Sequence, residues 1–193
     1  ILFQIFSALN IEESLLLNIL FNRKINIQDF DKIDFDRFVK IVSSHLMIPC
    51  TYSLIKKKKI ENRFPDELIN YFSYIYNINV NRNGIILDEI NLISKKFNLE
   101  QINHVFYKGA SMLVTVYKDN IGDRMLKDID ILVAKPDFKK IHGILNSLGY
   151  KKIVKYKKWK VRDNINYFNS KKKLMIEIHD RILDKENENL LSK

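Results

Sequence analysis

The sequence DIDILV at residues 128–133 is the most informative stretch of this chain. Its two acidic residues, Asp128 and Asp130, are two positions apart, and the other residues of the run are aliphatic. Residues two positions apart on a β-strand point to the same face, so the two carboxylates project together while Ile129 and Ile131 enter the core. The run therefore predicts a strand that is buried on one face and carries a pair of carboxylates on the other.

A second strand is predicted downstream, at residues 174–179. Its alternation places Glu177 and His179 on one face and Ile176 and Ile178 on the other. A third carboxylate from a neighbouring strand can bind a metal ion or act as a general base, although Glu177 taken alone is also typical of a solvent-facing position. For His179 we expect a packing role.

A turn of small residues lies upstream of both strands. Gly109, Ala110 and Ser111 follow a β-prone run at residues 102–107 and precede an apolar helix at about residues 112–117. Glycine allows the backbone to approach a phosphate closely, helix amides attract anions, and the hydroxyl of Ser111 can add a donor. Taken alone, the same turn is typical of a plain strand-to-helix connection with Ser111 as N-cap.

The combination of these three parts predicts a metal site. Adjacent carboxylates repel unless a cation neutralises them, and Mg²⁺ binds one or two carboxylates together with substrate phosphates. An isolated Asp-x-Asp pair is common on half-exposed strands, but the order of turn, pair and later acid is more specific. We therefore expect Asp128, Asp130 and Glu177 to bind Mg²⁺ or Mn²⁺, with Lys108 and Arg124 as cations for a triphosphate.

The remaining pattern predicts an α+β fold, with an N-terminal helical region at residues 1–98 and a mixed-sheet core with flanking helices at residues 99–193. Apolar residues recur at helical spacing in the first region, and Pro49 is expected to end its second helix, which spans residues 34–46. Asn83–Gly84 marks either a break or a tolerated weak point in a third helical stretch. The core is expected to contain strands at 102–107, 126–134, 161–168 and 174–179, with helices at 112–117 and 136–148.

Residues 106–180 resemble the nucleotidyltransferase superfamily, whose best-known fold is that of DNA polymerase beta. Within it, the chain looks like a poorly characterised bacterial nucleotidyltransferase family. That family also places a helical region before its catalytic core, so the resemblance covers most of the chain. The matching residues are Lys108, Gly109, Ala110, Tyr117, Arg124, the run 128–133, Gly149, Tyr150 and the run 176–179.

The resemblance implies a mixed sheet with two helices on one side and a nucleoside triphosphate bound through divalent ions. It also implies that Gly109 and Ser111 hold the phosphates, that Asp128 and Asp130 bind metal, and that Glu177 is the third acid. The superfamily prefers Gly-Ser or Gly-Gly at the turn, whereas here Ala110 separates the glycine from the serine. The family core is also expected to continue past residue 193.

Two functions from different classes are consistent with these residues. The first is a metal-dependent enzyme that transfers a nucleoside monophosphate, expected to be AMP from ATP, to a small molecule or a protein and releases pyrophosphate. The alternative is a non-catalytic module on the same fold that binds a nucleotide or a nucleic acid. The presence of all three acids favours the enzyme.

Composition adds expectations about partners and compartment. The net charge is +10, but the lysines come in separate short runs at 56–59, 151–158 and 171–173, so a nucleic-acid partner is not expected. No apolar run is long enough to span a bilayer, and no secretory leader is recognised. With Cys50 as the single cysteine, a disulfide framework is excluded, and the reducing cytoplasm is the expected compartment.

Overall fold

The computed structural model describes residues 9–153 and 165–182, and it confirms the α+β class. The chain divides into two compact units. The first comprises Ile1–Asn83 and Asp119–Met125, and the second comprises Gly84–Lys118 and Leu126–Lys193. The expected functional division into residues 1–98 and 99–193 stays a prediction.

The first unit is helical. Buried aliphatic and aromatic side chains from its helices, among them Leu15, Ile19, Phe38 and Phe72, form one hydrophobic core. Helix α2 begins with a capping box in which Asn10 and Glu13 bond to each other's backbone amides. The elements of this unit are α2 (Ile11–Leu20), η1 (Ile27–Lys32), α3 (Phe35–Ser44), α4 (Ile48–Lys58), η2 (Glu61–Arg63) and the part of α5 (Asp66–Leu99) up to Asn83.

The prediction for Pro49 was wrong. Helix α3 already ends at Ser44, and Pro49 lies in the first turn of α4, a helix that the sequence pattern did not predict. The first turn of a helix tolerates proline because the missing N–H has no intrahelical partner there. Pro49 therefore starts a helix and does not end one.

Helix α5 runs without a break from Asp66 to Leu99, so Asn83–Gly84 is a tolerated weak point. A Cβ on Gly84 would meet nothing within 4 Å. The apolar positions continue beyond it with Ile86 and Ile90, which are buried. Packing of this stripe outweighs the low helix propensity of a single glycine.

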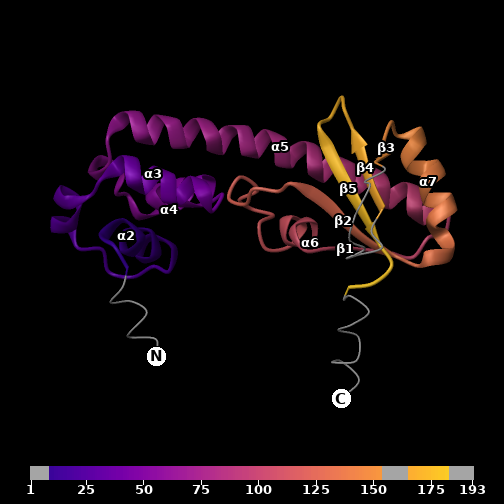
Figure 1. Ribbon diagram of the computed structural model, residues 1–193, viewed down its shortest axis with the longest axis horizontal. Coiled ribbons are helices and arrows are strands. Elements are labelled where there is room, and N and C mark those ends of the chain that lie inside the picture. Colours follow the sequence, from indigo (N-terminus) through magenta and orange to yellow (C-terminus); the bar gives the residue numbers. More distant parts are fainter. Residues whose placement is uncertain (1–8, 154–164, 183–193) are drawn as a thin grey trace, which may run out of the picture. The chain divides into compact units, whose positions relative to one another are not determined.

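The second unit contains a five-stranded mixed sheet of order β1-β2-β5-β4-β3, part of which Figure 1 shows in orange and yellow. Strands β2 and β5 are parallel, and the other neighbours are antiparallel. The strands are β1 (His104–Tyr107), β2 (Asp128–Val133), β3 (Lys151–Ile153), β4 (Ile165–Asn169) and β5 (Leu174–His179). The helices are α6 (Gly109–Val114), η3 (Lys135–Asp137), α7 (Phe138–Ser147) and the end of α5.

Most of the predicted core elements are confirmed. Strands β4 and β5 match two of the predicted strands and form an antiparallel hairpin, although residues 161–164 of the first predicted strand lie outside the described residues. Strand β3 was not predicted, because it has only three residues and two of them are exposed lysines. Residues 154–158 of the lysine run at 151–158 also lie outside the described part of the chain.

Glu89 ties helix α5 to the sheet within the second unit. This carboxylate is buried, accepts a hydrogen bond from the Tyr150 hydroxyl at 2.7 Å and forms an ion pair with Lys172. Burial and the neighbouring carboxylate raise the pKa of Tyr150. The hydrophobic face of the two central strands is formed by four buried isoleucines, Ile129, Ile131, Ile176 and Ile178.

None of the helices in the described part of the chain is both long and apolar enough to cross a bilayer.

Candidate active site

The two central strands of the sheet bring the predicted acids together. In the parallel pairing of β2 with β5, Asp130 lies directly opposite Glu177. In the antiparallel pairing of β1 with β2, Tyr107 lies opposite Asp130. Asp128 and His179 lie two residues from these positions, so they share the same face of the sheet. The register thus gathers side chains from three strands on one face.

Asp130 is the centre of this group. It is only 4% exposed, and its Oδ1 accepts hydrogen bonds from Lys108 Nζ at 2.6 Å and from His179 Nε2 at 3.0 Å. Burial raises the pKa of Asp130, but the hydrogen bonds from His179 and Lys108 outweigh that effect and hold the pKa below its usual value. Asp130 is therefore a charged carboxylate in a mostly buried position.

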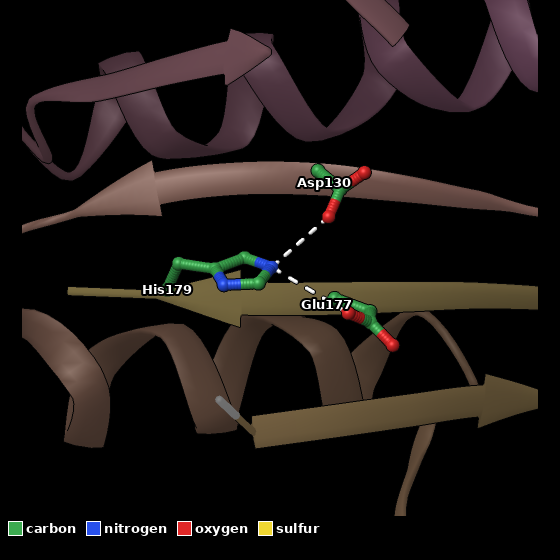
Figure 2. A group of neighbouring side chains, drawn as sticks. All are labelled: Asp130, Glu177 and His179. Atoms are coloured by element: carbon green, nitrogen blue, oxygen red, sulfur yellow. Dashed lines mark hydrogen bonds and ion pairs between the residues drawn. The ribbon is translucent and has the colours of Figure 1, made fainter. Parts of the chain in front are cut away.

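His179 contacts both facing acids. Its Nε2 lies 3.6 Å from Glu177 Oε2 in addition to its contact with Asp130, as Figure 2 shows. The His179 ring also meets the Tyr107 ring edge to face, with 5.2 Å between ring centroids. The packing role expected for His179 is thus only part of its environment. Its position on the same strand face as Glu177 was the sequence signal for this polar contact.

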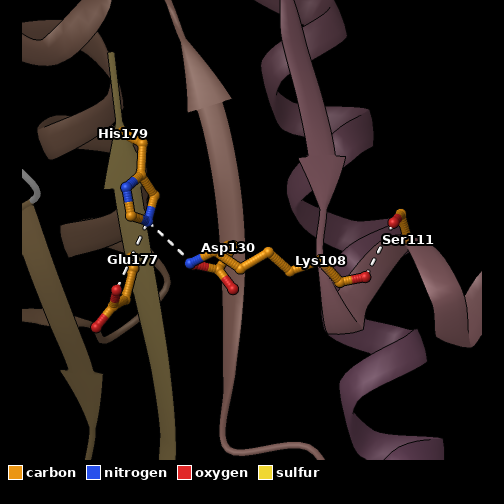
Figure 3. Close-up of polar contacts among 5 residues, drawn as sticks. All are labelled: Lys108, Ser111, Asp130, Glu177 and His179. Carbon is orange, nitrogen blue, oxygen red and sulfur yellow. Dashed lines mark hydrogen bonds and ion pairs between the residues drawn. The ribbon is translucent and has the colours of Figure 1, made fainter. Parts of the chain in front are cut away.

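Lys108 reaches the acids from the end of β1. Its Nζ lies 5.0 Å from the centroid of the Tyr107 ring, and its ion pair with Asp130 is visible in Figure 3. Its backbone has φ 53° and ψ −127°, and non-glycine residues rarely adopt a positive φ. Such a conformation costs on the order of 1–3 kcal/mol, and it persists only where the surroundings impose it.

Asp128 lies at the edge of the group. It is half-buried, and its pKa is raised by burial and by repulsion from Asp130 and Glu177. Lys108 and Lys127 act in the opposite direction but do not cancel the shift. The three carboxylates therefore carry an electrostatic cost that a further cation would relieve.

The small-residue turn is placed as expected next to Lys108. Gly109 and Ala110 are buried and begin the short helix α6. The hydroxyl of Ser111 donates to the backbone carbonyl of Lys108 at 3.0 Å. The helix starts at Gly109, three residues earlier than predicted, so these small residues form its first turn. Their contact with phosphate stays a prediction.

Arg124 belongs to the other compact unit, so its role toward a triphosphate stays a prediction. Its backbone carbonyl accepts hydrogen bonds from Asn79 and Asn83, at 3.0 Å and 2.8 Å. These contacts hold the main chain at Arg124 within its own unit.

The donor set fits a metal ion. One ligand atom each from Asp130, Glu177 and His179 can be chosen so that all three lie within 4.8 Å of one another. Two carboxylates and an imidazole are common ligands of divalent ions. Asp128, which we predicted as a ligand, is not in this closest trio, and His179, which we did not predict, is.

Comparison with known proteins gives one match. A family described as "uncharacterised nucleotidyltransferase" matches residues 31–193. Searches of curated proteins and of solved structures found no match.

Proposed function

This chain belongs to the uncharacterised nucleotidyltransferase family, and we propose that it transfers a nucleoside monophosphate from a nucleoside triphosphate to a small-molecule or protein acceptor. The triphosphate is expected to be ATP and the reaction to require Mg²⁺ or Mn²⁺. The observation that carries the proposal is the pairing of Asp130 with Glu177 on adjacent strands, with Lys108 bonded to Asp130. A buried and a partly buried acid next to one basic group, on one sheet face, suit a substrate that brings phosphates and metal ions.

The proposed reaction forms one P–O bond and breaks another. An oxygen of the acceptor attacks the α-phosphorus, a new P–O bond forms, and the bond to the β-phosphate oxygen breaks with release of pyrophosphate. Glu177 accepts the proton of the attacking hydroxyl as general base, since its carboxylate is only partly buried. A bound divalent ion would supply charge stabilisation for the oxygens around the reacting phosphorus.

The other predicted residues have binding roles in this proposal. Asp128, Asp130 and Glu177 hold the metal, and Lys108, whose ammonium is already directed to the same face, meets the triphosphate. The turn formed by Gly109, Ala110 and Ser111 lies immediately after Lys108 and contacts the phosphates, with Arg124 as an additional cation. We expect the reaction to take place in the cytoplasm and not on a nucleic acid.

Calorimetry tests the metal and nucleotide roles directly. ATP is titrated in the presence of Mg²⁺ or Mn²⁺ into the wild type, into the double variant Asp128→Asn/Asp130→Asn, and into Asp137→Asn. The last is a matched control because Asp137 makes no side-chain cap and lies outside the acid group. We expect metal-dependent ATP affinity to be lost in the double variant only.

A pyrophosphate-release assay with the four nucleoside triphosphates and candidate acceptors tests the transfer itself. Release that requires both divalent metal and acceptor, and that is absent in the double variant, supports the enzyme. Nucleotide binding without pyrophosphate release across the acceptors would indicate a non-catalytic binding module. Unchanged metal-dependent affinity in the double variant would contradict the assignment of these carboxylates.

A further inference from the structure

His179 is the most buried side chain that points at the paired acids. Its side chain is 5% exposed, and it lies on β5 two residues after Glu177, on the same face. One ring atom, Nε2, lies 3.0 Å from Asp130 Oδ1 and 3.6 Å from Glu177 Oε2. Figure 2 shows the ring directed toward both carboxylates. A single imidazole nitrogen is thus shared between two acids.

The ring is held in this orientation by the sheet. Tyr107 packs against it edge to face, with an interplanar angle of 84°. Tyr107 is itself fixed opposite Asp130 in the β1–β2 pairing, and His179 is fixed opposite Leu132 in the β2–β5 pairing. Two strand pairings and a ring contact therefore direct Nε2 at the acids before any ion arrives. A ligand that is already oriented loses little conformational freedom when it binds an ion.

The spacing of these atoms is that of neighbouring ligands on one ion. With metal–ligand bonds of about 2.1 Å at right angles, adjacent donor atoms are about 3 Å apart. The distance between His179 Nε2 and Asp130 Oδ1 is 3.0 Å. The distance from Nε2 to Glu177 Oε2 is 3.6 Å, slightly longer than the expected separation of neighbouring ligand atoms. Glu177 is also the partly exposed member of the group.

The Lys108 ammonium does not prevent this arrangement. It bonds to the same Oδ1 of Asp130, but its side chain is 46% exposed and can withdraw toward solvent or a phosphate. Metal binding by His179 requires the neutral ring with the lone pair on Nε2 and the proton on Nδ1. Replacing the contact between Nε2 and Asp130 by a shared ion leaves both groups satisfied.

We propose that Nε2 of His179 is a metal ligand together with Asp130 and Glu177, and that the site prefers a first-row transition-metal ion such as Mn²⁺ to Mg²⁺. The reason for the preference is that Mg²⁺ favours oxygen ligands, whereas imidazole nitrogen binds transition-metal ions more strongly. The proposal rests on the metal-dependent function proposed above, and it adds a nitrogen ligand and a class of ion to it.

Pulsed electron paramagnetic resonance of bound Mn²⁺ tests the nitrogen ligand. Full-length protein is prepared with ¹⁵N-labelled histidine and loaded with Mn²⁺, with and without unlabelled ATP. Electron spin-echo modulation from directly bound ¹⁵N is expected in both samples, at a frequency that nitrogen atoms of ATP cannot produce. Bound Mn²⁺ without histidine modulation would overturn the proposal and show that His179 only donates a hydrogen bond to Asp130.

Two variants assign the signal and the selectivity. His179→Gln is expected to abolish the modulation and to reduce the ratio of Mn²⁺ to Mg²⁺ affinity by roughly tenfold or more, a typical size for perturbed metal sites. His142→Gln is the matched control, because His142 is exposed on helix α7 and its ring contacts Tyr167 rather than the acids. Modulation that persists in folded His179→Gln protein, as judged by circular dichroism, would also overturn the proposal.

The same measurements separate this proposal from the proposed function. Pyrophosphate release that depends on metal, combined with bound Mn²⁺ lacking histidine coupling, rejects the His179 ligand and leaves nucleotidyl transfer in place. Absence of any Mn²⁺ binding with ATP present rejects both.

Discussion

Each compact unit contains a buried polar cluster, and the two clusters differ in charge and in the groups they contact. In the first unit, Asn79 and Asn83 form what we call the asparagine clamp. The Asn79 amide donates to the carbonyls of Gly122 and Arg124, at 2.7 Å and 3.0 Å. The Asn83 amide donates to the carbonyls of Ile121 and Arg124, the latter at 2.8 Å. Neutral side chains here satisfy the backbone of a loop.

In the second unit, the buried carboxylate of Asp130 is charged and bonds to other side chains. Asp130 accepts hydrogen bonds from Lys108 and His179. Burial and the neighbouring acids raise the pKa of Asp128. The clamp stabilises the fold because a buried carbonyl without a hydrogen-bond donor is costly. Converging carboxylates destabilise the fold because their like charges repel. We therefore expect the clamp to affect stability and the acids to affect the proposed reaction.

The largest expected effect is on transfer by Glu177→Gln. This change removes a charge without losing volume, so it relieves repulsion among the carboxylates but removes the proposed general base. We expect pyrophosphate release to fall by roughly 10²-fold or more, with apo stability unchanged or raised by up to about 1 kcal/mol. Thermal melting and a release assay on the same preparation measure both. Glu100→Gln, at an exposed position of the same unit, is the control. Normal turnover, or a much lower melting temperature, would show that Glu177 is peripheral or structural.

The asparagine clamp should give the opposite pattern. Asn79→Ala removes the donor to the Gly122 carbonyl and Asn83→Ala the donor to the Ile121 carbonyl, while the Arg124 carbonyl keeps one of its two donors in either variant. We expect each change to cost about 1–3 kcal/mol of stability in denaturant unfolding. Affinity for Mn²⁺ should stay at the wild-type value in the folded variants. Asn77→Ala, at an exposed position of α5, is the matched control. A large change in metal affinity with unchanged stability would reverse the comparison.

Gly122→Ala tests the loop that the clamp holds. A Cβ at this position would lie 2.5 Å from a ring carbon of Tyr76 and 2.6 Å from Val80 Cγ2, so the neighbours must shift. We expect a loss of about 1–3 kcal/mol, as for other overpacked sites. In helix α7, a Cβ at Gly143 would meet nothing within 4 Å. We therefore expect Gly143→Ala to raise the stability by up to about 1 kcal/mol, because alanine has the higher helix propensity. Equal melting temperatures for the two variants would contradict the close packing of the loop.

The smallest expected effect is that of Lys108→Met on metal binding without nucleotide. The ammonium competes for Asp130 Oδ1, but it is half exposed, so the pair contributes at most about 1 kcal/mol. Removing it should raise Mn²⁺ affinity by up to about fivefold, measured by calorimetry without ATP. Lys127→Met removes the same charge next to Asp128 and controls for general electrostatics. Equal gains in both variants would mean that contact with Asp130 is not the cause.

Much of the fold was readable from local patterns. The period of two in residues 128–133 and 174–179 predicted both central strands and the shared face of Asp128 and Asp130, because side-chain alternation is a property of the strand itself. The helix predicted at 136–148 agrees with α7 and its C-cap Leu148, and Gly149, which has φ +84°, follows directly. Helix α4 and strand β3 were missed, since a proline in a first turn and a three-residue strand of mostly exposed positions leave no periodic signal.

Which residues alternate, where the acids lie along the chain and which small residues follow Lys108 can all be seen in the sequence. The three-dimensional structure adds that Asp130 faces Glu177 and that His179 contacts both acids. It also shows that Lys108 directs its ammonium to Asp130 from a backbone conformation with positive φ. The register of two parallel strands separated by more than forty residues depends on packing across the whole sheet, and no local pattern encodes it. The backbone conformation of Lys108 is likewise imposed by its surroundings, because the residue itself disfavours it.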